Sequence, residues 1–129
     1  MQMLNRTWFI YMKDSTADNK DRLHQIEKAI NQVESFVTGI SANEFNNNEL
    51  ISSAVLFQFS VIGEAIKHID KNLLNKYSYP WYKVRSFRNL ILHEYFRIEL
   101  SAVWEVINKD LPELKEMIQQ ILDQEFKEN

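Results

Sequence analysis

The sequence predicts an all-α protein, folded as an antiparallel bundle of four to five helices with short loops. The 129 residues include only two glycines and two prolines, too few for the many tight turns of a sandwich or a barrel. Apolar residues recur every three or four positions through long segments, which is the period of a helix with one buried face. No segment shows a convincing two-residue alternation, so no strand is expected.

The first helix is expected from about residue 16 to 38. Ser15, with Asp18 three residues on, resembles a capping box, in which two side chains satisfy the first backbone amides of a helix. Gly39 suits the position just after the helix. The asparagine-rich stretch 41–48 is expected to be a loop. The apolar stripe of this helix comprises Leu23, Ile26, Ile30, Val33 and Val37.

The second helix should run from about residue 49 to 75, and it is the most apolar part of the chain. A helix that is apolar over much of its circumference packs on several sides, so this one should be central. Its main apolar stripe comprises Ile51, Val55, Phe59, Ile62, Ile66, Ile69 and Leu73, widened by Ala54, Phe57, Val61 and Ala65. Its narrow polar strip includes Ser60, Glu64, Lys67 and Lys71.

A third helix is expected over about residues 80–95. The preceding Tyr77-Ser78-Tyr79-Pro80 breaks the second helix. Pro80 suits the first turn of a helix because its missing amide has no partner to lose there. Ser78 or Tyr79 would then be the cap.

Two shorter helices complete the bundle. One should begin near Glu99 and end near Asn108. Asp110 should then cap the last helix, with Pro112 in its first turn and Glu113 at the capping-box position. The inner face of that helix is formed by Leu111, Leu114, Ile118, Ile121 and Leu122.

The chain is expected to form one helical domain over residues 15–129, preceded by an N-terminal extension, 1–14, to which no structure is assigned. The apolar run Trp8–Met12 is shorter than the ~7–15 residues of a signal-peptide core. No stretch approaches the ~20 apolar residues of a membrane span. The absence of cysteine excludes thiol nucleophiles and disulfide scaffolds. We therefore expect a cytoplasmic protein without a membrane partner.

The charge distribution is uneven. The formal net charge is −3 at pH 7, which is the wrong sign for an obvious nucleic-acid-binding protein. Residues 67–97, however, contain seven basic and two acidic residues, whereas the rest of the chain is acidic. This basic middle could bind an anion locally. The alternative is that solvated helix faces simply differ in charge.

The candidate site lies at residues 88–95, Arg-Asn-Leu-Ile-Leu-His-Glu-Tyr. Histidine transfers protons near pH 7, and arginine holds a phosphate through two hydrogen bonds. With the amide of Asn89, these groups suit phosphodiester cleavage by the 2′-hydroxyl of RNA, a reaction that needs no metal ion. The alternative is a structural or solvent-facing histidine.

The geometry of an ideal helix separates the two main candidates. Asn89 and His93 are four residues apart and share a face. Arg88 lies roughly 140° away from His93, at about 100° per residue. Arg88 must therefore reach around the helix, the helix must end near His93, or a second copy of the chain must complete the site.

The other histidines are weaker candidates. His24 is expected to be solvated. Glu64 and His68 are four residues apart and either pair with each other or form half of a metal site. The sequence has no HExxH motif, no cluster of metal-ligand residues and no glycine-rich phosphate loop, so neither a metal ion nor a cofactor is expected.

Residues 88–95 resemble the signature of HepT-like proteins in the HEPN superfamily: arginine, four residues, histidine, one residue, tyrosine. Ile62-Gly63-Glu64-Ala65 is similar to the IGEA segment of that family, and Pro80-Trp81 to the PW that opens its motif helix. Val103-Trp104-Glu105 and Asp110-Leu111-Pro112 resemble its closing VWE and DLP. The ordered matches cover about residues 20–115. Two features depart from the family pattern: the extension that precedes Met12, and the phenylalanine at position 87.

The resemblance implies a homodimeric, metal-independent endoribonuclease, the toxin of a type II toxin–antitoxin pair whose partner is a minimal nucleotidyltransferase antitoxin. Two motif helices, one from each chain, would form a composite cleft. Arg88 would stabilise the scissile phosphate, His93 would act as general acid and base, and Asn89 would orient the RNA substrate. Tyr95 matches the tyrosine that the antitoxin adenylylates, and the added charge and bulk would exclude RNA. Glu64 would support the motif helix or, alternatively, form only a surface salt bridge.

Two other functions remain open. The chain could be a non-catalytic HEPN-like subunit that binds substrate or nucleotide for a nucleotidyltransferase, which its net acidity favours. It could also be a structural helical dimer that has lost the activity of its motif.

Overall fold

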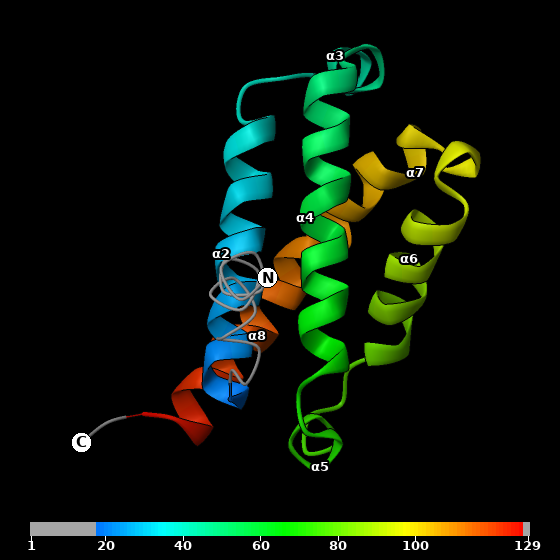
Figure 1. Cartoon of the computed structure of the whole chain (residues 1–129). Coiled ribbons are helices and arrows are strands. Elements are labelled where there is room, and N and C mark those ends of the chain that lie inside the picture. Colours follow the sequence, from blue (N-terminus) through cyan, green and yellow to red (C-terminus); the bar gives the residue numbers. More distant parts are fainter. Residues whose placement is uncertain (1–17, 128–129) are drawn as a thin grey trace, which may run out of the picture.

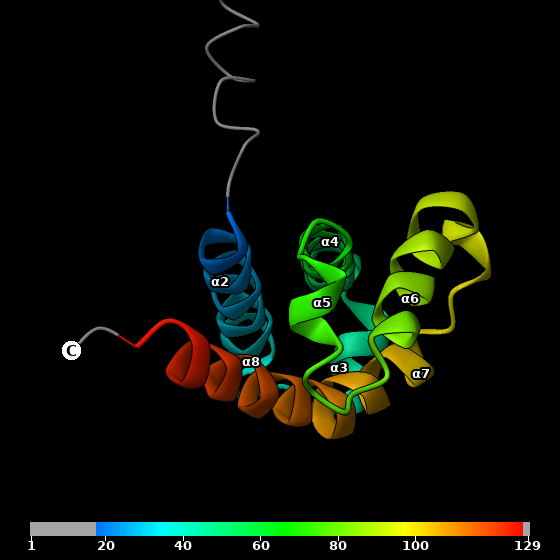
Figure 2. The ribbon, with the colours of Figure 1, turned by 90° about the horizontal axis from the view of Figure 1, so that it is seen from below.

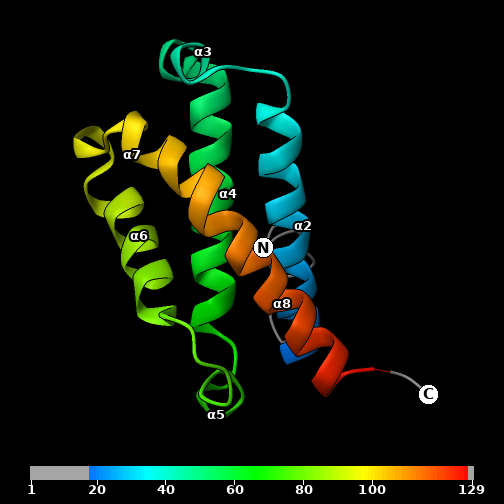
Figure 3. The same ribbon diagram turned by 180° about the vertical axis from the view of Figure 1, so that it is seen from behind.

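The computed structural model describes residues 18–127, so the predicted extension, 1–14, lies outside the described residues. Helices α2 (Asn19–Val37), α4 (Glu49–Lys67) and α6 (Trp81–His93) lie side by side in alternating directions (Figure 1). The chain then turns behind them, and α7 (Leu100–Glu105) and α8 (Leu111–Glu125) cross this layer diagonally (Figures 2 and 3). The predicted all-α bundle is confirmed, with its last helix crossing the others rather than running alongside them.

Helix α4 is central, as predicted. It packs against both α2 and α6, and eight of its residues are buried. Contrary to the expectation that no segment resembles a membrane span, the length and composition of α4 alone would suit one, but its buried apolar residues belong to the shared core, as those of a core helix do. Burying each large aliphatic side chain contributes about 1.5–3 kcal/mol, so this helix provides much of the hydrophobic stabilisation.

The start of α2 differs from the prediction. Asp18 is itself the N-cap, because its Oδ1 accepts a hydrogen bond from the amide of Asp21 at 2.9 Å. The capping box predicted from Ser15 is therefore wrong in its assignment of Asp18, and Ser15 lies outside the described residues. The end of α2 matches the prediction, since Gly39 follows with a φ of +77°, a conformation that glycine adopts without strain.

The predicted loop over 41–48 is wrong, because it contains helix α3 (Ala42–Asn47). Ser41 Oγ accepts a hydrogen bond from the amide of Glu44 at 3.1 Å, and the Glu44 carboxylate accepts one from the amide of Ser41 at 3.4 Å. Phe45 is fully buried and packs on Trp104 with ring centroids 5.2 Å apart. A reciprocal cap and one aromatic anchor therefore form a helix in a sequence of low helix propensity.

The helix predicted to reach residue 75 ends at Lys67, and a short helix, α5 (Lys71–Leu74), follows it. Asp70 causes the restart, because its carboxylate accepts a hydrogen bond from the amide of Asn72 at 2.9 Å. The amide of Asp70 donates to the side-chain oxygen of Asn19 at 3.0 Å. This tie to the first turn of α2 fixes the point at which the chain leaves the direction of α4.

Helix α6 begins one residue later than predicted. Pro80 is its N-cap and no side chain caps it, so the predicted cap at Ser78 or Tyr79 is wrong. The buried Trp81 anchors this end, since its Nε1 donates to the carbonyl of Leu74 at 3.1 Å. The helix ends at His93, and a 3₁₀ turn, η1 (Tyr95–Arg97), follows.

Helices α7 and α8 are joined rather than separately capped. Between them lies a π-helical segment, η2 (Val106–Asp110), and Asp110 has helical backbone angles without a capping hydrogen bond. The predicted cap at Asp110 is therefore wrong. Pro112 explains the segment, because a proline ring clashes with the carbonyl four residues earlier in a regular α-helix. A wider π turn removes that clash and lets the helix continue.

Candidate active site

Arg88 lies on the side of α6 that faces α4, and only 19% of its side chain is exposed. Its Nη2 forms an ion pair with Glu64 Oε2 of α4, and its Nη1 donates to Oδ1 of Asn89 at 3.2 Å. The structure therefore brings together three of the predicted site residues. The two contacts hold the guanidinium in place and leave its remaining N–H groups available for an anion.

Gly63 allows α4 and α6 to approach closely at this point. A Cβ atom at position 63 would lie 2.3 Å from the Cβ of Arg88, a distance at which two carbon atoms overlap. Glycine within a helix costs about 1 kcal/mol relative to alanine. The absence of a side chain at position 63 offsets this cost, because it leaves room for the aliphatic part of Arg88 beside Glu64.

Glu64 has a partner on each carboxylate oxygen. Oε2 pairs with Arg88, and Oε1 lies 2.8 Å from Nε2 of His68, one turn further along α4. The hydrogen bond to His68, followed by the charge of Arg88, lowers the pKa of the Glu64 carboxyl despite its partial burial. Of the two alternatives for Glu64 and His68, the structure shows the pairing, and Glu64 stays ionised in mildly acidic solution.

Because the pKa of Glu64 is lowered in the folded protein, the contribution of Glu64 to the free energy of unfolding should depend on pH. Glu64→Gln should lower the free energy of unfolding at pH 7 by less than about 1 kcal/mol, as expected for a partly exposed ion pair. Because the folded-state pKa lies below the ordinary value of 4.5, the difference should persist above pH 4.5 and disappear as the pH falls through the folded-state pKa. Urea unfolding of both proteins across this range measures it.

A matched control is Glu27→Gln, which removes the carboxylate that pairs with His24 on α2 at 3.4 Å. This pair joins neighbouring turns of one helix and its histidine is exposed, whereas Glu64 joins two helices through Arg88, so Glu27→Gln should change stability less than Glu64→Gln does. Equal effects of the two variants would contradict a special role for the Arg88–Glu64 pair.

His93 is not brought to Arg88 within one chain. It is the last residue of α6 and is exposed, and its side chain forms no hydrogen bond or ion pair within residues 18–127. The helix does end at His93, which is one of the three predicted solutions to the angular separation. The guanidinium of Arg88, however, is turned to Glu64 and away from this helix end. The ring of His93 is therefore left open to solvent and to an approaching molecule.

Tyr95 lies in the 3₁₀ turn after α6 and is 42% exposed. Its hydroxyl shares a hydrogen bond of 3.1 Å with the hydroxyl of Ser53 on α4. Its ring meets the ring of Phe96 edge-on, with centroids 5.8 Å apart, and Phe96 is 99% exposed. Sequence reasoning missed Ser53, because a contact between residues 42 positions apart leaves no local pattern.

The surroundings of the site combine a polar hollow with exposed apolar side chains. Arg88 and Glu64 line a shallow pocket of about 310 Å³ between α2, α4 and α6, and Arg22 of α2 lines it as well. Phe57, predicted to widen the apolar stripe of α4, is instead 63% exposed. Large exposed apolar or aromatic side chains near this site are Leu50 and Phe57 on α4, Leu90 and Leu92 near the end of α6, and Tyr95 and Phe96 in η1.

Metal ligands do not gather at the site. Among the described residues, no three histidine, aspartate or glutamate side chains lie close enough to hold a metal ion together. Glu64 and His68 form a pair, with Arg88 as the third member of the cluster. The cluster thus presents one anchored cation to an incoming ligand.

A helical bundle with an anchored arginine on one helix and an exposed histidine and tyrosine at its end fits the all-α, HEPN-like fold that the sequence motifs implied. The chain belongs to the ribonuclease HepT-like family, whose model matches residues 26–121. This membership confirms the family that the sequence motifs indicated.

Individual relatives agree with this assignment. The protein named "Putative RNase MJ1380" of Methanocaldococcus jannaschii is 33% identical over 81% of this chain and 97% of its own length. "Putative RNase TTE0752" of Caldanaerobacter subterraneus is 34% identical over 69% of this chain and 80% of its own length. "Probable ribonuclease HepT" of Thermococcus cleftensis is 30% identical over 75% of this chain and 89% of its own length. No solved structure matches the chain significantly.

Proposed function

We propose that this protein is a metal-independent endoribonuclease, active as a homodimer and acting as the toxin of a type II toxin–antitoxin pair in the cytoplasm. Membership of the ribonuclease HepT-like family supports the ribonuclease activity. The observation that carries the proposal is the guanidinium of Arg88, fixed by Glu64 and Asn89 beside a pocket, with the open imidazole of His93 five residues further on.

In the proposed reaction, the phosphodiester is cleaved by the neighbouring 2′-hydroxyl of the RNA. The imidazole of His93 takes the proton of the 2′-hydroxyl while the 2′-oxygen attacks phosphorus. The bond between phosphorus and the 5′-oxygen then breaks. The protonated imidazole of His93 then gives this proton to the leaving 5′-oxygen, so that the products are a 2′,3′-cyclic phosphate and a 5′-hydroxyl end. Arg88 stabilises the additional negative charge on the phosphoryl oxygens in the transition state. Asn89 orients Arg88 through the hydrogen bond to Nη1.

The ribonuclease activity is tested with a labelled RNA in EDTA, after intact mass has established that the protein carries no AMP. We expect cleavage with EDTA present, and no cleavage of a substrate with 2′-deoxyribose at the cleaved position. Cleavage of the deoxy substrate would contradict the attack by the 2′-hydroxyl. The absence of any cleavage by unmodified dimer, over several RNAs including tRNA, would contradict the enzyme assignment.

A homodimer would supply the histidine that one chain does not bring to Arg88. The exposed apolar side chains of α4 and α6, such as Phe57 and Leu92, favour an interface on this face, since patches of this kind mark interaction sites. In a two-fold dimer, the same surface of each chain meets its counterpart, and Arg88 of one chain can face His93 of the other.

Mixing two inactive variants tests this composite site. Arg88→Ala and His93→Ala should each lose cleavage alone. Unfolding and refolding an equimolar mixture makes about half of the dimers mixed, and each mixed dimer has one intact site, so activity should return to about a quarter of the parent value. A mixture that remains inactive, although light scattering shows that dimers form, would contradict a site shared between chains.

The partner in this proposal is a minimal nucleotidyltransferase antitoxin that transfers AMP to Tyr95. Tyr95 is 42% exposed, and its hydroxyl is oriented by the hydrogen bond with Ser53, which supports modification at this residue. An adenylyl group would add negative charge and bulk at the end of α6, at the mouth of the proposed cleft, and repel the RNA backbone. Treatment with the antitoxin and ATP should add one AMP per chain and stop cleavage. Tyr95→Phe should accept no AMP.

The second candidate function is a non-catalytic binding subunit of a nucleotidyltransferase. The overall negative charge of the chain favours it, as does the fact that Arg88 already pairs with Glu64. Tight nucleotide binding without cleavage of any RNA would establish this function in place of the first.

A further inference from the structure

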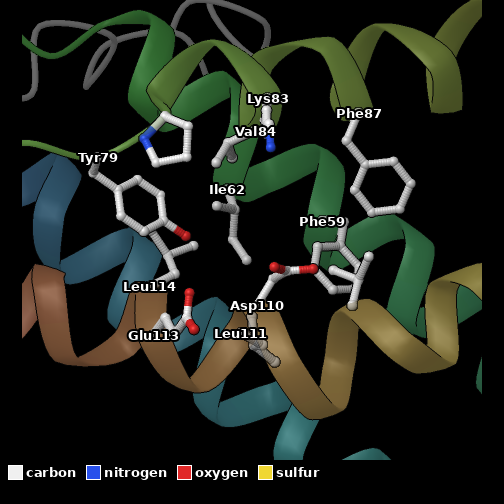
Figure 4. A pocket seen from close by; sticks show the side chains of 12 residues that line it. Phe59, Ile62, Tyr79, Lys83, Val84, Phe87, Asp110, Leu111, Glu113 and Leu114 are labelled. Atoms are coloured by element: carbon white, nitrogen blue, oxygen red, sulfur yellow. The ribbon is translucent and has the colours of Figure 1, made fainter.

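A second pocket lies between α4, the start of α6, the π-helical segment η2 and α8 (Figure 4), and it shares no lining residue with the pocket beside Arg88. Its volume is about 370 Å³, which is within the range of pockets that hold small molecules. The space is therefore large enough for a ligand of its own.

The walls of this pocket are mainly apolar. At one end, Phe59 of α4 and Phe87 of α6 lie with ring centroids 5.1 Å apart and ring planes inclined by 55°. Ile62 of α4 and Leu111 and Leu114 of α8 complete the apolar surface. Phe87, which departs from the family pattern, thus contributes an aromatic wall to the pocket as well as packing against the core.

Besides Lys83, three polar side chains border the same space. Figure 4 shows the hydroxyl of Tyr79 and the carboxylates of Asp110 and Glu113 around it. None of these three side chains forms a hydrogen bond or an ion pair with another side chain in the described part of the chain. Burial of Tyr79, with the two carboxylates nearby, raises the pKa of Tyr79 to about 12, so the phenol is neutral at pH 7 and can donate a hydrogen bond.

The π-helical segment helps to place these groups. Asp110 is its last residue, and the wide turn that accommodates Pro112 carries Asp110 to the edge of the pocket. π-Helical turns of this kind are frequent at functional sites. The pocket contains two carboxylates and one ammonium group, that of Lys83, and its formal charge of −1 complements a cation.

We propose that this pocket binds a small organic cation, a primary ammonium group on an aromatic or branched apolar body. Asp110 and Glu113 hold the ammonium group, the Tyr79 hydroxyl donates to any oxygen on the ligand, and the apolar body contacts Phe59 and Phe87. Aromatic rings also attract cations through their faces, so Tyr79 adds to the preference for positive charge.

Three probes of nearly equal shape test the charge preference: phenethylammonium, neutral 2-phenylethanol and anionic 3-phenylpropanoate. Isothermal titration calorimetry at pH 7 should give a Kd for the cation at least tenfold lower than that for the alcohol, and the anion should bind most weakly. Equal binding of the three probes, or no saturable binding of the cation, would overturn the proposal. These titrations need no RNA, so their outcome is independent of the proposed function.

Variants locate the binding. The double variant Asp110→Asn, Glu113→Gln should lose the tenfold preference for the cation, and Lys83→Met should increase it. Val84→Trp should fill the pocket and abolish binding, with circular dichroism as the check that the bundle is retained. Glu105→Gln is the matched control, because Glu105 lies on α7 outside the pocket and pairs with Lys109. Cation binding that survives both Val84→Trp and the double variant would place the site elsewhere and overturn the proposal.

Discussion

Replacing His93 with alanine should lower the rate of RNA cleavage by about 10²–10⁴-fold, the contribution typical of a positioned general acid or base. The imidazole has no hydrogen-bond partner within the described residues and is exposed, so the substitution removes no contact of the core. The free energy of unfolding should therefore change by less than about 0.5 kcal/mol, as for most surface substitutions. Single-turnover cleavage and urea unfolding of the same preparations separate the two effects.

His24→Ala provides the matched control for this prediction. His24 is also a helix-surface histidine, and within residues 18–127 its side chain pairs with the neighbouring Glu27 at 3.4 Å. Its loss should leave cleavage unchanged. If His93→Ala cleaves RNA as fast as His24→Ala does, His93 has no role in the reaction, and the proton transfers must be assigned to another group.

Gly63→Val should be among the most destabilising single substitutions in this protein. Its Cβ would overlap with the Cβ of Arg88, which is fixed to the backbone of α6 and cannot move without the helix. Overpacking of this kind costs about 1–3 kcal/mol or more, roughly 5–15 °C in Tm for a domain of this size. Thermal unfolding measures the change, and cleavage should also fall because Arg88 moves away from Glu64.

For Gly63→Ala, the direction of the change in stability tests the same contact. Helix propensity alone would stabilise the protein by about 1 kcal/mol when alanine replaces glycine within a helix. The 2.3 Å approach to Arg88 predicts a loss instead. Ser60→Ala, one turn earlier on the same helix, is the control without a buried clash. A raised Tm for Gly63→Ala would show that α4 and α6 separate easily at this point.

The long helices could be predicted from the sequence because their burial is periodic. In α4, residues such as Val55, Phe59 and Ile62 recur at helical spacing and are buried as predicted. The errors occurred where one local interaction outweighs periodicity. Glu44 closes a cap that creates α3, Asp70 interrupts the second helix, and Pro112 is accommodated by a π turn instead of a new helix start. Such interactions depend on the chain path around them.

In the candidate site, too, contacts between neighbours in sequence could be predicted better than contacts between distant segments. The spacing of Glu64 and His68 allowed their pairing, as one of two alternatives. The same spacing put Asn89 on the face of His93, whereas in the structure its side chain accepts a hydrogen bond from Arg88. The contact between Tyr95 and Ser53, and the apolar pocket beyond Phe87, could not be predicted, because both arise where segments distant in sequence pack together. The exposure of Phe57 could not be predicted either, because the spacing of apolar residues does not distinguish a face buried in the bundle from a face left open for a partner.

The diagonal path of the last helix has a consequence for the order of folding. Helix α8 packs on α2, and an ion pair of 2.8 Å joins Lys115 to Glu34, 81 residues away. The fully buried Ile118 and Ile121 complete a core that the earlier helices begin. Contacts between neighbouring helices are local and form quickly, whereas this closure spans most of the chain. On a ribosome, a stable bundle can therefore form only after α8 has emerged, so a nascent chain lacking it would expose the apolar face of α2.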